Sequence, residues 1–208
     1  MHPTAELSRR ALVSRGVRAG ATIALSVAAA GAVAGAAVGA PAASGLLADQ
    51  DLATARLAVA AELLAIEFYG RAVGSGQFTG NGLKALERAL FNEQEHLAAV
   101  TGILTGAGQS APTAGDFAFT LPADSFASRT SIAKLGVTLE TAFVGAYVGA
   151  AAAFVPVDLR GAAASIAASE AEHLSFLSSI ATGRPVGVSF PAPLDLAAAS
   201  DALAAYLG

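Results

Sequence analysis

Glu93-Gln94-Glu95-His96-Leu97 and Glu170-Ala171-Glu172-His173-Leu174 are two copies of one pattern, E-x-E-H-L, which lie 77 residues apart. The chain has three histidines, and two of them stand in these copies, each three residues after a glutamate. Residues i and i+3 share a face of a helix, so each copy presents one carboxylate and one imidazole to the same point. The pattern therefore indicates a metal site to which two helices contribute.

A second repeated pattern lies upstream of each copy. Glu62 is followed seven residues later by Tyr69, and Glu140 is followed seven residues later by Tyr147. Seven residues make two helical turns, so each glutamate shares a helix face with its tyrosine. The sequence therefore consists of two similar halves, each with Glu-x6-Tyr on a first helix and Glu-x-x-His on a second.

The chain after residue 48 predicts an all-α domain over residues 49–208. Prolines and glycines separate the expected elements, with Asn81 and Asp158 as N-caps of the second and fourth helices. Four long helices are predicted, at residues 50–74, 81–105, 128–153 and 158–183. A long connection over 107–128 joins the second to the third, and a short C-terminal helix is predicted at 194–207. Two tight helical hairpins joined by one long crossover resemble the ferritin-like four-helix bundle.

Composition narrows the chemistry. The chain has 208 residues, of which 54% are hydrophobic and 13% charged, and it contains no cysteine. That length suits one domain. The lack of cysteine excludes disulfides, thiolate zinc sites, iron–sulfur clusters and cysteine nucleophiles.

The first 48 residues have the composition of a leader. Arg9-Arg10 stands in a basic segment, residues 19–48 carry no charge, and Ala40-Pro41-Ala42 offers a small-residue cleavage site. The paired arginines resemble a bacterial twin-arginine export signal, with Leu12 where that pattern usually has phenylalanine. We expect export to the periplasm, cell envelope or extracellular space. The alternative is an uncleaved membrane anchor formed by residues 19–48, which is long enough to span a bilayer.

Removal of the leader makes the chain more acidic. Four of the 12 basic residues and one of the 16 acidic residues lie in it, so 8 basic and 15 acidic residues remain, a net charge of −7. No basic stripe remains, and nucleic acid is not an expected partner. An excess of carboxylates on a weakly charged chain favours cations.

With these patterns, residues 49–183 resemble the ferritin-like superfamily of di-metal carboxylate bundles. More narrowly, they resemble the bacterial and plant ferritin-like family that includes desiccation-related proteins, although this chain has Ala65 where that family often has a second glutamate. The resemblance implies two divalent ions, iron or manganese. It also implies the roles of six ligands: bridging Glu93 and Glu170, terminal Glu62 and Glu140, and one histidine for each ion, His96 and His173.

Several neighbouring residues keep two interpretations. Glu67 is expected to flank the site, and the alternative is that it replaces Glu62 as the ligand. Glu95 and Glu172, which follow Glu93 and Glu170 by two residues, are expected to point to another face. Tyr69 and Tyr147 are either core tyrosines or catalytic groups, as donors to the carboxylates or redox-active groups beside the metals.

Two functions of different classes fit this site. One is a di-metal oxidase or peroxide-consuming protein that uses oxygen or peroxide and oxidises Fe(II). The other is a non-catalytic metal-binding bundle with a stress-protective or structural role. The small residues around Gly145 and Gly149 would allow close packing in a homo-oligomer.

Overall fold

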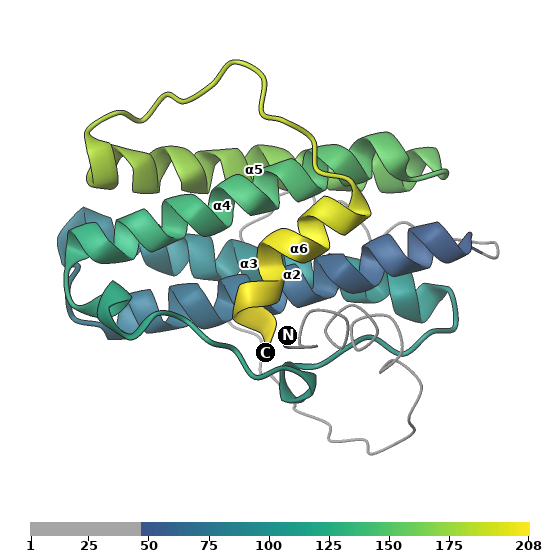
Figure 1. Cartoon of the computed structure of the whole chain (residues 1–208), viewed down its shortest axis with the longest axis horizontal. Helices are drawn as coiled ribbons and strands as arrows, with labels where there is room; N and C mark the ends of the chain where they lie inside the picture. Colours follow the sequence, from purple (N-terminus) through teal and green to yellow (C-terminus); the bar gives the residue numbers. More distant parts are fainter. Residues whose placement is uncertain (1–46) are drawn as a thin grey trace, which may run out of the picture.

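Four long helices form the body of the molecule in the computed structural model, which describes residues 47–208 (Figure 1). They have 26, 27, 25 and 26 residues and are α2 (Asp49–Gly74), α3 (Gly80–Gly106), α4 (Arg129–Ala153) and α5 (Val157–Thr182). The predicted export signal and membrane anchor fall outside the described residues, apart from residues 47 and 48, and remain predictions.

The helices form two antiparallel hairpins, which confirms the predicted all-α bundle. Helix α2 packs on α3, and α4 packs on α5. The crossover between α3 and α4 contains two short 3₁₀ turns, Ala114–Asp116 and Ala123–Phe126. Helix α6 (Leu196–Leu207) lies across α2 and α4, and the crossover joins it through a hydrogen bond from Thr120 N to Tyr206 O (Figure 1).

Two predicted N-caps are wrong by two residues each. Helix α3 begins after Thr79, whose extended backbone makes it the N-cap in place of Asn81. Helix α5 begins after Pro156, so Asp158 lies in the first turn instead of capping it. An acidic residue in the first turn still favours this helix end, since it faces the positive end of the helix dipole.

The four glutamates predicted as metal ligands, Glu62, Glu93, Glu140 and Glu170, lie at the middle of the four long helices. Each is within about one residue of its helix's midpoint, as follows from the bounds of α2 to α5. Apolar side chains fill the bundle in two clusters, one around Phe68 and Phe143 and the other around Val59 and Leu159. The four buried glutamates therefore lie at mid-length in the bundle, among the apolar side chains of these two clusters.

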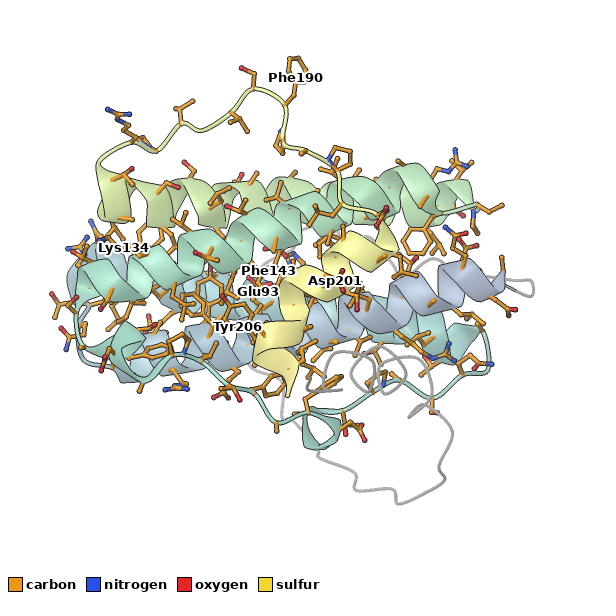
Figure 2. All side chains as sticks on the ribbon, viewed as in Figure 1. Glu93, Lys134, Phe143, Phe190, Asp201 and Tyr206 are labelled. Carbon is orange, nitrogen blue, oxygen red and sulfur yellow. The ribbon has the colours of Figure 1, made fainter. Side chains whose placement is uncertain are left out.

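The chain after α5 returns to the bundle by way of an exposed arch. Figure 2 shows Phe190 at the top of this arch, where it is 91% exposed. The arch then docks on α4, where Leu194 N donates to Gly145 O at 2.8 Å and a Cβ on Gly149 would lie 1.8 Å from Leu194 O. The small residues predicted to allow packing between subunits thus pack against a segment of their own chain.

Among the described residues, one helix is long and apolar enough to cross a membrane. It is α4, and 56% of its most apolar 18-residue stretch is buried in the bundle. Burial of this kind, with Glu140 at mid-helix, is what a core helix of a bundle requires.

Candidate metal centre

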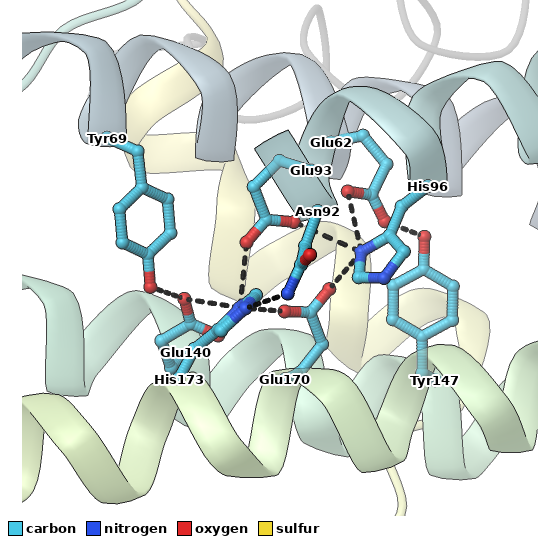
Figure 3. A network of polar contacts seen from close by, with 9 residues as sticks. All are labelled: Glu62, Tyr69, Asn92, Glu93, His96, Glu140, Tyr147, Glu170 and His173. Carbon is cyan, nitrogen blue, oxygen red and sulfur yellow. Dashed lines mark hydrogen bonds and ion pairs between the residues drawn. The ribbon is translucent and has the colours of Figure 1, made fainter. Parts of the chain in front are cut away.

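The site gathers one glutamate from each long helix and one histidine from each of α3 and α5 (Figure 3). The four carboxylates are buried, with exposed fractions of 0 or 1%: Glu62, Glu93, Glu140 and Glu170. Their convergence follows from the mid-helix positions and from the i, i+3 spacing of each Glu-x-x-His. The structure thus brings together all six residues that the sequence indicates.

Glu93 and Glu170 each offer one oxygen to each histidine. The Nδ1 atom of His173 lies 2.9 Å from Glu93 Oε1 and 3.0 Å from Glu170 Oε2. The Nδ1 atom of His96 lies 3.2 Å from Glu93 Oε2 and 3.3 Å from Glu170 Oε1. The two carboxylates therefore stand between the histidines and connect two neighbouring positions.

The remaining two glutamates complete these positions from opposite sides. Glu62 Oε2 lies 3.7 Å from Nδ1 of His96, and Glu140 Oε1 lies 3.8 Å from Nδ1 of His173. Each position has three carboxylates and one imidazole, whose ligand atoms all lie within 4.8 Å of one another. The two groups share Glu93 and Glu170.

The tyrosines pair across the bundle. The hydroxyl of Tyr69 on α2 donates to Glu140 on α4, and the hydroxyl of Tyr147 on α4 donates to Glu62 on α2. Each tyrosine thus binds the glutamate of the other half rather than the one seven residues before it. Both are buried, so they are part of the polar cluster as well as of the core.

Burial and the repulsion between carboxylates favour the neutral forms of the two glutamates from α2 and α4 and of the two tyrosines. Burial, reinforced by the charges of Glu170 and Glu93, raises the pKa of Glu62 and of Glu140 well above 4.5. Burial and the neighbouring carboxylates also raise the pKa of Tyr69 and Tyr147 well above 10.0. Both phenols therefore remain protonated donors.

The histidines and Glu93 respond in the opposite sense. Burial lowers the pKa of each histidine, but hydrogen bonds to Glu170 and Glu93 outweigh it and raise the pKa to about 9 for His96 and about 10 for His173. Burial raises the pKa of Glu93, but hydrogen bonds from His173 and His96 outweigh it and lower the pKa to about 2. Without metal, protons on the site's side chains offset the buried negative charge.

The donor set fits a pair of divalent cations. Glu62 Oε2 and Glu140 Oε2 are buried and accept no hydrogen bond from the described part of the chain. An unsatisfied buried oxygen is costly, and four carboxylates in an apolar bundle need positive charge nearby. Oxygen and imidazole nitrogen ligands suit iron and manganese.

The glutamates with open interpretations lie outside this cluster. Glu67 Oε1 lies 4.0 Å from Nη1 of Arg71 on the surface of α2, so Glu67 has the flanking position expected for it. Glu95 and Glu172 are exposed.

Sequence reasoning missed Asn92. Its Nδ2 lies 3.1 Å from Nε2 of His173, whereas Nδ1 of the same ring is the nitrogen that contacts Glu93 and Glu170. It stands directly before Glu93, whereas the second half has Ser169 before Glu170. The repeat therefore gave no signal for it.

Comparison with known families agrees with this architecture. The family model of the ferritin-like domain matches residues 50–182, which contain α2 to α5 except Asp49, the first residue of α2, and every proposed ligand. The comparison with curated proteins found no match. Because the family model covers more than half of the chain, the protein belongs to the ferritin-like family.

Proposed function

We propose that the cluster binds two divalent ions, iron or manganese, which Glu93 and Glu170 bridge. Glu62 and His96 would complete one position, and Glu140 and His173 the other. The observation that carries this proposal is that Glu93 and Glu170 each direct one oxygen to each histidine. Four carboxylates balance the four positive charges of two divalent ions.

When bound, a pair of iron or manganese ions supplies redox chemistry with oxygen or peroxide, including the oxidation of Fe(II). The chain contributes the environment for that chemistry. Four helices fix the ligand positions, and the four carboxylates are buried, with Phe68 and Leu64 in the apolar core cluster that also contains Tyr69. From this site, together with the twin-arginine pattern at Arg9-Arg10, we propose an exported di-metal oxidoreductase that consumes oxygen or peroxide.

The two tyrosines would orient the carboxylates of the proposed terminal ligands, Glu62 and Glu140. Tyr147 holds Glu62, and Tyr69 holds Glu140, each by a hydrogen bond from its hydroxyl. This fixes the orientation of two proposed terminal ligands and leaves a phenolic proton beside each position. We propose that both tyrosines are catalytic, as hydrogen or proton donors during turnover.

Substitution of both bridging glutamates tests the ligand assignment. Glu93→Ala combined with Glu170→Ala is expected to abolish metal binding, measured by elemental analysis after loading with Fe(II) or Mn(II). The bundle is expected to remain folded by circular dichroism, because two buried acidic groups leave together with the ions. The matched control is Glu95→Ala with Glu172→Ala, on the same helices but exposed, which should bind metal as the wild type does. Stoichiometric metal in the Glu93/Glu170 variant would refute the assignment.

Consumption of oxygen and peroxide by the metal-loaded protein tests the catalytic part. We expect turnover with iron or manganese, and we expect Tyr147→Phe and Tyr69→Phe to lower it while leaving metal content unchanged. The control is Tyr206→Phe, outside the cluster. A protein that binds two ions and turns over neither oxidant with either metal would instead be a non-catalytic metal-binding bundle.

A further inference from the structure

A cavity of about 400 Å³ lies between α2, α4 and the segment that leads into α6. Its walls are mainly small or apolar side chains, and its volume falls within the range of small-molecule binding sites. The side chains that set its width include Leu57, Ala58 and Ala61 on α2 and Ala146 and Ala150 on α4. None of these residues belongs to the ligand set described above.

The cavity is elongated and differs between its ends. On α2 its lining runs from Gln50 to Ala61, which corresponds to about 16 Å along the helix axis. The polar side chains of Gln50 and Thr54 belong to the first half of this stretch, whereas Tyr147, whose hydroxyl donates to Glu62, lies near its second end at Ala61. This shape and polarity match an aliphatic chain with one polar end.

Tyr147 connects the cavity to the proposed metal centre. Its side chain lines the cavity, while its hydroxyl donates to Glu62 inside the cluster (Figure 3). A molecule that fills the cavity would therefore lie against the ring of a residue that holds a proposed metal ligand. The third wall, Pro193 to Leu196 and Ala199, lies beyond residues 50–182 and so beyond the part of the chain that the family model matches.

The charge of the walls selects among amphiphiles. Asp195 is in the lining, and its carboxylate accepts a hydrogen bond from Ala198 N at the start of α6. The lining contains no basic side chain to offset this charge. An anionic head group would meet a carboxylate of the same sign, whereas a hydroxyl can hydrogen-bond to Gln50 or Thr54.

We propose that this cavity is a binding site for an uncharged amphiphile, a medium-chain aliphatic alcohol, with its chain directed toward Tyr147. Access of this molecule to the metals rests on the proposed function, but its binding in the cavity does not. The site is formed by α2, α4 and the chain after α5, and it requires no metal to exist.

Calorimetric titration of the full metal-loaded chain with 1-octanol tests the proposal. Saturable binding of about one molecule per chain is expected. Ala58→Leu and Ala146→Leu, which enlarge half-buried lining residues on α2 and α4, should each weaken binding roughly tenfold or more by filling the cavity. The matched control is Ala164→Leu, an exposed position on α5, which should bind as the wild type does. Octanoate should bind more weakly than octanol.

Metal content and thermal unfolding are measured on the same samples. All variants should keep the metal content and folded state of the wild type, so a loss of octanol binding reports on the cavity alone. No saturable binding of octanol to the wild type, or equal binding by the wild type and both filled variants, would overturn the proposal. Loss of metal from the wild type would instead count against the proposed function.

Discussion

Asn92 makes the two halves of the site unequal at the level of single residues. It contacts Nε2 of His173, whereas its counterpart in the second half is Ser169. Because Nδ1 of His173 faces the carboxylates, a cation bound there leaves Nε2 with the proton. The amide oxygen of Asn92 would then accept that proton after a flip of the amide group, and it would fix the ring in the metal-binding tautomer.

Asn92→Ala is therefore expected to weaken the binding of one of the two ions about 10- to 100-fold, with the other ion less affected. Titration of the metal-free protein with Mn(II) measures both affinities. Ser169→Ala is the matched control from the equivalent position and should titrate as the wild type does. Identical isotherms for the two variants would show that Asn92 has no positioning role.

At the level of elements, the segment from Pro193 to Leu196 depends on glycine in α4. A Cβ at Gly149 would lie 1.8 Å from the backbone oxygen of Leu194, and backbone cannot rotate away as a side chain can. This contact holds the chain where it enters α6, which in turn covers α2 and α4. Gly149 is thus a requirement of close packing rather than of backbone conformation.

Gly149→Ala is expected to lower the free energy of unfolding by about 2 kcal/mol or more, since the docked segment must move. Gly161→Ala on α5 is the matched control, because nothing lies within 4 Å of its Cβ position. That change should be neutral or stabilise the protein by up to about 1 kcal/mol, as expected for alanine in a helix interior. Chemical denaturation measures both. A Gly149→Ala variant as stable as the wild type would contradict the packing described here.

For the whole molecule, the charges of the site link stability to pH. The pKa values of Glu62 and Glu140 are raised above 4.5, and those of His96 and His173 are raised from 6.5 to about 9 and 10. A group with a raised pKa stabilises the folded state below its unfolded pKa, and this contribution is lost as pH rises through the folded value. Glu93, with its pKa lowered to about 2, contributes above pH 4.5 and loses its contribution only as pH falls toward 2.

The metal-free protein is therefore expected to become less stable as pH rises from 6.5 toward 10, and the metal-loaded protein should not show this decline. The difference arises because bound cations replace the protons that the site otherwise needs. Urea denaturation of both forms across this range measures it. Constant or rising stability of the metal-free form over the same range would contradict the charge arrangement of the site.

Much of this architecture is contained in the sequence, because regular helices convert spacing into geometry. The Glu-x-x-His repeat and the upstream glutamates predict a shared site, and the structure places all of them at mid-bundle. The crossed pairing of the tyrosines was not predictable, because it depends on how α2 and α4 pack side by side. The same holds for Asn92, whose contact crosses between helices, and for the cavity beside Tyr147, which needs the returning segment after α5.

Metal stoichiometry tests the central claim most directly. The full chain, loaded with Fe(II) without oxygen or with Mn(II) and freed of excess ions, is analysed for metal and protein on the same sample. Two neighbouring positions that share Glu93 and Glu170 predict two ions per chain. A chain that retains less than one ion with either metal would contradict a bridged di-metal centre.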